Sequence, residues 1–242
     1  MPRFFVESLT PDMPRVQLEG EAAAHAKVLR LRIGEQVTLC DGRGSDYEAM
    51  VEAINGQTVD LSIQSAAPSV SEPSVACTVY MGFSKGDKLE HVIQKATELG
   101  AAAIVAFPSS RCVAKYDKKA LEKKLPRWQK IAASAAEQSG RGRIPEVRAA
   151  GSYAEALTEA AQADAALFFY ENEHAHTLSQ ALACKYQTAS LMTGPEGGFS
   201  PEEAQAAEDA GLQVCTLGRR ILRCETAPLC ALSAVMYASG EY

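Results

Sequence analysis

The pattern of apolar and polar positions changes near residue 70 and predicts two domains. Before that point, the apolar residues come in short or alternating runs of the kind that build half-buried strands. Asn55-Gly56 predicts a tight hairpin turn between two of these strands. We therefore predict a small β-rich domain over residues 1–70. Its predicted elements are a helix within 21–30, a strand, turn and strand over 37–54, and a strand over 58–64.

A Ser- and Pro-rich stretch at 65–74 predicts a linker, and beyond it apolar strands alternate with helices. Strands that are apolar throughout and separated by helices predict a parallel sheet covered on both faces. Ser200 and Glu203 have the spacing of a helix-capping box, and Asp87 and Glu90 have that of a second cap pair. The predicted strands are 75–82, 101–108, 163–170, 188–194 and 212–218, and the predicted helices are 88–99, 118–138, 177–183 and one that begins near 226.

Ligands of parallel sheets bind outside the carboxyl ends of the strands. This rule directs attention to three loops, at 170–175, 193–200 and 218–226. The second of them, in MTGPEGGFS, places three glycines within five residues after a buried strand, so its backbone N–H groups could approach a ligand closely. It lacks the spacing of a phosphate loop or of a dinucleotide fingerprint. A tight strand-to-helix turn explains the glycines equally well.

The third loop, in LGRRILRCETAP, mixes apolar and charged residues, and no amphipathic helix explains this mixture. Such a segment is suited to a flat heteroaromatic ring, whose edges the backbone would read while Ile221 and Leu222 cover its faces. The alternative is a basic surface turn that leads into a helix capped by Thr226. The residues favour the first interpretation.

Composition excludes several classes of protein. Of the 242 residues, 47% are hydrophobic and 22% are charged, as in ordinary globular chains. No apolar run approaches the ~18 residues of a membrane span. Acidic residues stand where an export signal would be apolar, so we expect no membrane segment and a cytoplasmic location.

The charge is unevenly distributed along the chain. The net charge of −6 argues against a protein that coats nucleic acid by bulk charge. Between Arg111 and Arg148, however, eleven Lys and Arg residues stand against four acids, so this segment carries +7 and the remainder −13. It is either a footprint for a polyanion or a solvated helix face, and charge alone favours the second.

The cysteines and histidines show no metal-binding or disulfide pattern. Seven cysteines without a C-x-x-C pair argue against a zinc site and against a disulfide framework. His174 and His176 stand two positions apart, which does not place them on one helical face. We therefore expect no metal.

Several motifs together resemble one enzyme family. GPEGGFS, followed about twenty residues later by LGRRILRCETA, resembles the SPOUT class of methyltransferases, and within it the small-subunit ribosomal RNA uridine N3-methyltransferases. HAKVLRLRIGEQVTLCDGRG is similar to the PUA-like RNA-binding domain of that family. KGDKLEHVIQKATELGAAAIVAF and AAEQSGRGRIPEV resemble further parts of it, so the likeness covers nearly the whole chain.

The resemblance implies an α/β fold. A PUA-like β-barrel over residues 1–70 would precede a parallel-sheet SPOUT domain with a deep trefoil knot over residues 75–242. It also implies a homodimer, with the last helix (229–236) as an interface candidate, and S-adenosylmethionine (SAM) as the cofactor. By position, the cofactor residues would be Tyr170, Glu171, Thr193, Gly194, Gly197, Gly198, Leu217, Gly218, Ile221, Leu222, Arg223, Thr226 and Ala227.

With uridine N3 as the acceptor, negative charge develops on the uracil ring and needs a nearby cation or N–H donor. Arg111 and Arg223 are candidates for this catalytic role, and Glu225 is a candidate to orient an arginine or to accept the proton. A phosphate contact or a salt bridge is the alternative for Arg111, and a carboxylate at a helix start is the alternative for Glu225. We expect ribosomal RNA contacts from Arg3, Lys27, Arg30, Arg32, Arg43, Lys115, Arg141 and Arg143.

The net negative charge also predicts weak affinity for naked RNA, so the assembled small ribosomal subunit would be the preferred substrate. Two other functions stay open at this point. One is a SPOUT methyltransferase that acts on another RNA nucleotide. The other is an RNA-binding ribosome assembly factor that has the same fold but no catalytic activity. The intact glycine loop and the RRILRCETA segment argue against this second function.

Overall fold

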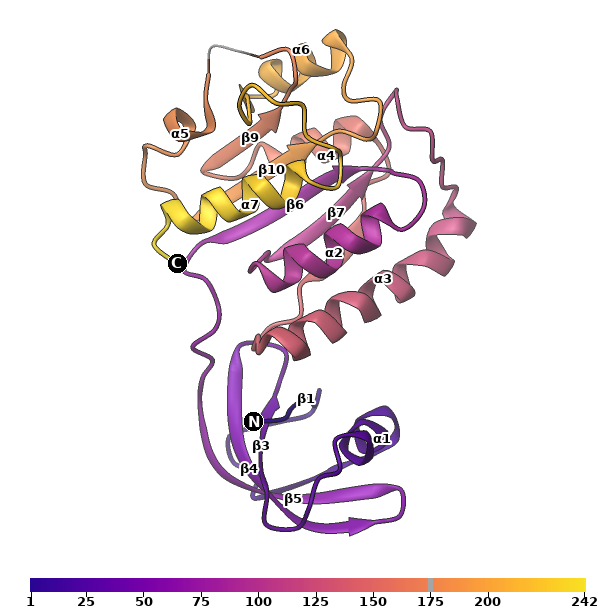
Figure 1. Ribbon diagram of the computed structural model, residues 1–242, viewed down its shortest axis with the longest axis vertical. Helices are drawn as coiled ribbons and strands as arrows, with labels where there is room; N and C mark the ends of the chain where they lie inside the picture. The colour runs from indigo at the N-terminus through magenta and orange to yellow at the C-terminus, as the bar shows by residue number, and fades with distance from the viewer. Residues whose placement is uncertain (174–175) are drawn as a thin grey trace. The chain divides into compact units, whose positions relative to one another are not determined.

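The computed structural model describes residues 1–173 and 176–242, and the described chain divides into two compact units (Figure 1). The first unit is made of Met1–Glu72 and Ala136–Ile144, and the second of Pro73–Ala135 and Pro145–Tyr242.

The segment 136–144 lies in the first unit, whereas the sequence analysis placed it in the second domain. The reason is one carboxylate. The Glu72 side chain accepts hydrogen bonds from the backbone N–H groups of Gly142 and Arg143, at 2.9 and 3.1 Å. It also forms an ion pair with Arg141 at 2.7 Å. These contacts join the segment to the end of the first unit's own chain.

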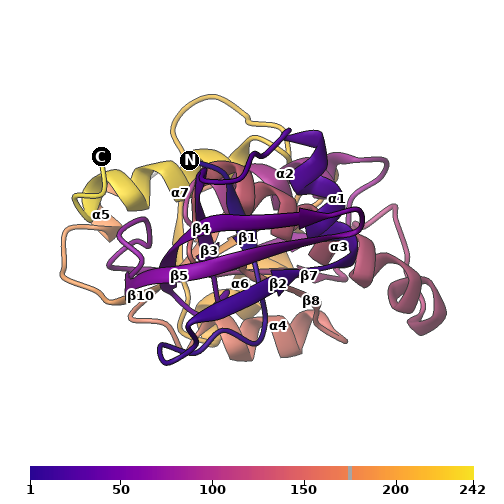
Figure 2. The ribbon, with the colours of Figure 1, turned by 90° about the horizontal axis from the view of Figure 1, so that it is seen from below.

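The first unit is built on a five-stranded sheet, whose strands are β1 (Arg3–Phe5), β2 (Arg15–Leu18), β3 (Gln36–Cys40), β4 (Ser45–Asn55) and β5 (Thr58–Pro68). They lie in the order β1-β3-β4-β5-β2, and only β1 and β3 run parallel. Figure 2 shows the long strands β4 and β5 side by side. Leu39, Tyr47 and Leu61 are fully buried in a core that also takes side chains from helix α1 (Gly20–Val28).

The β4–β5 hairpin confirms the turn predicted at Asn55-Gly56, since β4 ends at Asn55 and Gly56 takes the left-handed φ of +54° that the turn requires. The predicted linker is wrong over residues 65–68. There the chain still pairs with β4, with Ala66 opposite Tyr47, because the ladder continues past a register shift. Strands β1 and β2 were not predicted, since three or four residues are too few to show an alternation.

The second unit contains a six-stranded sheet, whose strands are β6 (Ala76–Gly82), β7 (Ala103–Phe107), β8 (Glu146–Ala149), β9 (Ala165–Phe169), β10 (Thr188–Thr193) and β11 (Gln213–Cys215). Their order is β11-β9-β10-β6-β7-β8, and every neighbouring pair is parallel. The predicted parallel sheet is therefore confirmed. Only β8 was not predicted, because its four residues EVRA are half charged.

The described helices after residue 72 are α2 (Lys88–Glu98), α3 (Lys118–Ser139), α4 (Tyr153–Ala160), α5 (Leu178–Ala181), α6 (Pro201–Asp209) and α7 (Ala227–Ala238). The last residues of α3, from Ala136 on, belong to the first unit. α2 and α7 contact each other, and α7 lies on β6 and β10 (Figure 1). α4 and α6 contribute to a second core around Phe168 and Phe199. No helix within the described residues is both long and apolar enough to cross a membrane.

One of the two predicted helix caps is present. Ser200 and Glu203 form a reciprocal capping box at the start of α6. The expected cap pair of α2 is wrong, because Asp87 makes no side-chain cap bond and Glu90 accepts a hydrogen bond from Arg127 at 2.7 Å instead.

Candidate functional site

The three loops at the carboxyl ends of β9, β10 and β11 meet around one cavity of about 670 Å³. This size lies within the ~300–1,000 Å³ range of small-molecule sites. The parallel sheet explains the meeting, because neighbouring strands all end at the same edge. Its lining residues are Lys88, Phe169, Tyr170, Glu171, Asn172, Thr193, Gly194, Pro195, Glu196, Gly197, Gly198, Phe199, Thr216, Leu217, Gly218, Arg219, Arg220, Ile221, Leu222, Arg223, Cys224, Glu225 and Ala227.

The glycine loop after β10 is packed so closely that a side chain at any of three positions would require a neighbour to shift. A Cβ added at Gly198, whose φ is +63°, would come 2.5 Å from Glu171 Oε1. One at Gly194 would come 3.1 Å from the Gly198 backbone. One at Gly197 would come 3.0 Å from Arg111 Cβ. The glycines therefore serve close packing of this loop against its neighbours.

A buried carboxylate fixes the far end of the glycine loop. Glu203 is 8% exposed and accepts hydrogen bonds from the backbone N–H of Ser200 at 2.9 Å and from that of Ser110 at 2.7 Å. Glu203 thus ties the start of α6 to the loop after β7. This contact positions Arg111, the next residue along the chain.

Arg111 lies against the glycine loop and outside the lining of the cavity. Its Nη1 donates a hydrogen bond to the Gly197 carbonyl at 3.2 Å, and its side chain is exposed. Arg223 and Glu225, the other two catalytic candidates, do line the cavity. The structure therefore brings two of the three candidates to the cavity and places the third against the glycine loop, outside the lining.

Lys88 and Glu196 form an ion pair at the cavity that the sequence analysis did not identify. Lys88 Nζ lies 3.1 Å from Glu196 Oε1 and 3.9 Å from Glu225 Oε2. The backbone N–H of Lys85 also donates to Glu196 at 2.9 Å. Burial acts to raise the pKa of Glu196, but these hydrogen bonds outweigh it and hold that pKa below its usual value.

The pKa of Glu225 is lowered first by a hydrogen bond from its own backbone N–H, against a smaller opposing effect of burial. The thiol of Cys224 also donates to this carboxylate at 3.2 Å, and burial raises the pKa of that thiol to about 12. Glu225 is therefore an ionised carboxylate at neutral pH. A lowered pKa makes it a poor proton acceptor, so it is better suited to orienting a cation than to acting as a base.

The ion pair between Glu196 and Lys88 should make the thermal stability of the protein depend on pH. Because its folded-state pKa is depressed, its ion pair stabilises the protein above its ordinary pKa near 4.5 and ceases to do so as the pH falls through the lower folded value. The pair is partly exposed, so we expect wild type to melt only about 2 °C above Glu196→Gln at pH 7. The gap in melting temperature should narrow as the pH falls below 4.5 and through the lower folded-state pKa of Glu196. Equal melting temperatures at pH 7 would contradict the contribution of the pair.

The lining contains twelve of the thirteen residues that the sequence analysis assigned to the cofactor. The exception is Thr226, which is exposed at the start of α7 and makes no side-chain cap bond. Ile221 is 86% exposed at the rim. The same strand-end rule that found the three loops could have found Lys88, because it begins α2 after β6, the neighbour of β10.

Two of the residues assigned to RNA have largely buried side chains that form ion pairs within the first unit. Arg141 is 4% exposed and forms an ion pair with Glu72, so it serves the packing of its own segment. Arg3 forms an ion pair with Asp46 at 2.7 Å, and its side chain is 15% exposed. The other six are exposed: Lys27, Arg30, Arg32, Arg43, Lys115 and Arg143.

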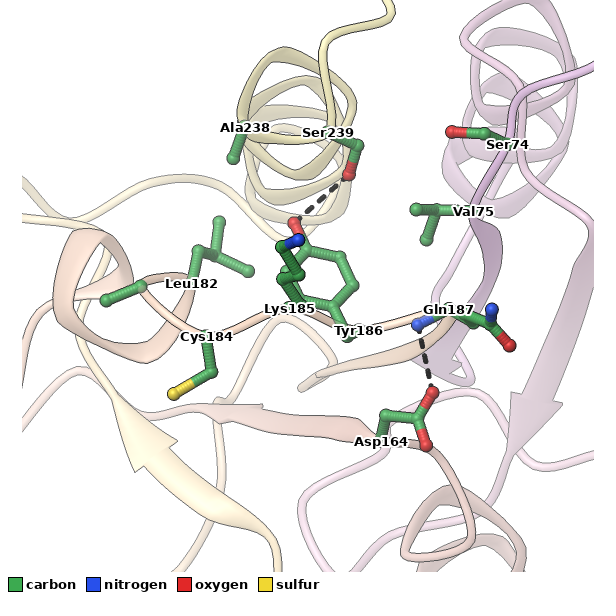
Figure 3. Close-up of a pocket in the computed structure, with 11 residues that line it drawn as sticks. Ser74, Val75, Asp164, Leu182, Cys184, Lys185, Tyr186, Gln187, Ala238 and Ser239 are labelled. Atoms are coloured by element: carbon green, nitrogen blue, oxygen red, sulfur yellow. Dashed lines mark hydrogen bonds between the residues drawn. The ribbon is translucent and has the colours of Figure 1, made fainter.

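A second cavity, of about 690 Å³, lies at the opposite, amino-terminal ends of the strands (Figure 3). Two pairs of its polar groups are already bonded to each other. Ser239 Oγ donates to Tyr186 Oη at 3.2 Å, and the Gln187 backbone N–H donates to Asp164 at 2.9 Å. The carboxyl-end cavity is therefore the better candidate for a site.

Within the described residues, no group of three or more His, Cys, Asp or Glu side chains is placed to hold a metal ion. The seven cysteines, all in the described part of the chain, are free thiols. His174, one of the two histidines considered for a metal, and the end of the 170–175 loop lie outside the described residues.

Comparison with known proteins agrees with this architecture. Residues 71–236 match a family described as an RNA methyltransferase domain, and residues 18–64 match an RNA methyltransferase PUA domain. The fold and the site thus define an RNA methyltransferase with an attached PUA domain.

Relatives and solved structures narrow the class. The ribosomal RNA small subunit methyltransferase E of Bacillus subtilis is 34% identical, over 98% of this chain and 96% of its own. That of Mycobacterium bovis is 36% identical, over 96% and 90%. The crystal structure of the Neisseria gonorrhoeae enzyme bound to SAM is 34% identical with a TM-score of 0.88, over 98% of this chain and 97% of its own. The chain belongs to the ribosomal RNA small subunit methyltransferase E family.

Proposed function

We propose that this protein transfers a methyl group from SAM to N3 of a uridine in small-subunit ribosomal RNA. The observation that carries the proposal is the carboxyl-end cavity, in which a tightly packed glycine loop meets the basic loop 218–226. The Neisseria gonorrhoeae relative, which covers 98% of this chain, was solved with SAM bound.

The cavity has the groups that an adenosyl sulfonium ligand requires. Leu217, Ile221 and Leu222 offer apolar surface for a ring. Glu171, which lies against Gly198, and Glu196, within the glycine loop, add carboxylates to the lining, where a positively charged ligand gains attraction. The bound cofactor would supply an activated methyl group, and no metal is required for that chemistry.

The residues of this chain would then orient the acceptor. Uridine N3 must lose its proton and face the methyl group, so the base has to be unpaired or extruded. Arg223 lines the cavity and could stabilise the negative charge on the uracil ring. Glu225 would hold Arg223 or Lys88 in place, consistent with its lowered pKa.

We propose that the exposed cations Lys27, Arg30, Arg32, Arg43, Lys115 and Arg143 contact RNA phosphates. The chain carries a net charge of −6, so these contacts must act locally, and the assembled subunit should be preferred over naked RNA. Equal methylation of both substrates would count against this preference. A cytoplasmic location follows from such a substrate.

The test of the function is mass mapping of small-subunit ribosomal RNA from cells with and without this protein. One methylated uridine should disappear and return on complementation, and methylation should be reproduced with purified protein, SAM and unmodified subunits. Loss of a methyl group from another nucleotide would show a different acceptor. Calorimetry that detects no SAM binding, with or without RNA, would favour a non-catalytic assembly factor.

We also propose the homodimer that the resemblance implies, together with its trefoil knot. Not all of the helix 229–236 can form the dimer interface. Leu232, Val235 and Met236 are buried within the second unit, where α7 contacts α2, β6 and β10. The outer side of α7 offers Cys230 and Tyr237, which is 73% exposed. Sedimentation at micromolar concentration should give a dimer, and Tyr237→Glu should weaken it. A monomeric wild-type protein would overturn this proposal.

A further inference from the structure

Arg43 and Arg143 lie directly opposite each other, although a hundred positions separate them in the sequence. They are partners in an isolated antiparallel bridge within the first unit. The Gly44 N–H donates to the Gly142 carbonyl at 3.1 Å beside this bridge. A Cβ added at Gly44 would come 2.8 Å from Arg143 Nε, so the arginine side chain lies across the Gly44 backbone. Both side chains are exposed.

Largely buried ion pairs hold the two segments that carry these arginines, residues 41–46 and 141–143. Asp46 in the first segment pairs with Arg3, and Arg141 in the second pairs with Glu72. Asp41 accepts hydrogen bonds from the backbone N–H groups of Arg43 and Ser45, at 2.8 and 3.0 Å. The carboxylates that contact these two segments are thus already engaged by other groups, which leaves the two guanidinium groups on a fixed frame.

Side chains directly opposite each other in an antiparallel pair project on the same side, with Cβ atoms about 5 Å apart. Like charges in this position destabilise the pair. Within the described residues, neither guanidinium group forms an ion pair or a side-chain hydrogen bond. An arginine fork matches the oxygens of a phosphate, and two forks around one phosphate would turn the repulsion into binding.

We infer that Arg43 and Arg143 act together as a clamp for one phosphate group of the RNA backbone. This inference rests on the proposed function and deepens it, since it places the two arginines, which lie a hundred positions apart in the chain, at one site. The clamp orients the substrate and takes no part in methyl transfer.

The experiment measures methylation of small subunits from cells that lack this protein, at several salt concentrations. Arg43→Gln and Arg143→Gln should each raise KM several-fold, leave kcat and the SAM Kd unchanged, and lower the slope of log KM against log salt by about 1. The double variant should raise KM by less than the product of the single effects, because the two residues hold one group. Arg15→Gln is the matched control, since Arg15 is an exposed cation of the same unit that pairs with Glu52 at 3.3 Å.

Charge reversal separates a ligand clamp from a structural pair. Arg143→Glu should form an ion pair with Arg43, so the melting temperature should stay equal or rise while KM increases at least as much as in Arg143→Gln. A fall in melting temperature would assign the pair a structural role and overturn the inference. So would KM values equal to those of Arg15→Gln.

Inorganic phosphate distinguishes the source of the ligand. RNA should be displaced from wild type only by high millimolar phosphate, to no greater extent than by other salts of equal ionic strength. Selective competition by low phosphate would indicate a site for the free ion and contradict an RNA clamp. If the wild-type protein does not methylate the subunits, the proposed function is wrong. If the wild type is active and the variants do not show the expected rise in KM, only the clamp is wrong.

Discussion

Gly197→Val should abolish methylation and weaken SAM binding at least ~100-fold, or about 2.7 kcal/mol. The reason lies in the packing of the glycine loop against the Arg111 segment. The added Cβ would lie 3.0 Å from Arg111 Cβ and 3.1 Å from the Arg111 carbonyl oxygen. Because one of these atoms is backbone, the glycine loop or the Arg111 segment has to shift, and this loop lines the cavity.

Calorimetry with SAM measures this effect, and thermal melting separates it from unfolding. Gly197→Ala serves as the milder variant and should lose affinity by a smaller factor. Gly151→Ala is the matched control, since its Cβ would meet only the flexible end of Glu155, at 2.8 Å. Unchanged SAM affinity in a folded Gly197→Val protein would remove the glycine loop from the cofactor site.

The parallel sheet and the place of the site could be predicted because both depend on local signals. The apolar strands β6, β7, β9 and β10 are readable from single runs of the chain, and the strand-end rule then locates the loops. The sequence resemblance added the identity of the ligand, which composition and periodicity do not carry.

The missed features depend on contacts between distant residues. The strand-end rule applies to Lys88, which follows β6, but nothing in either segment alone shows that β6 is the neighbour of β10. Arg141 was assigned to RNA as part of a basic segment that could contact a polyanion, but its partner Glu72 lies 69 positions away. The same carboxylate draws the segment 136–144 into the first unit, which no pattern within that segment indicates.

Arg111→Ala should lower kcat by about 100-fold, the usual effect of removing one donor to a developing negative charge, and change the SAM Kd less than ~3-fold. Arg111 lies outside the cavity lining, so its loss opens no hole in the cofactor site. It keeps one hydrogen bond to the Gly197 carbonyl, at 3.2 Å, and the guanidinium group remains exposed at the edge of the glycine loop. Substrate could therefore reach its other N–H groups.

The kinetic pattern of Arg111 variants decides between its three possible roles. Arg111→Lys keeps the charge but loses the planar fork, so partial recovery of kcat would support charge stabilisation. A rise in KM for RNA with unchanged kcat, and a lower salt slope, would make Arg111 a phosphate contact. A SAM Kd that rises as much as kcat falls would show that the hydrogen bond to Gly197 is its contribution, because the glycine loop would then have lost its brace.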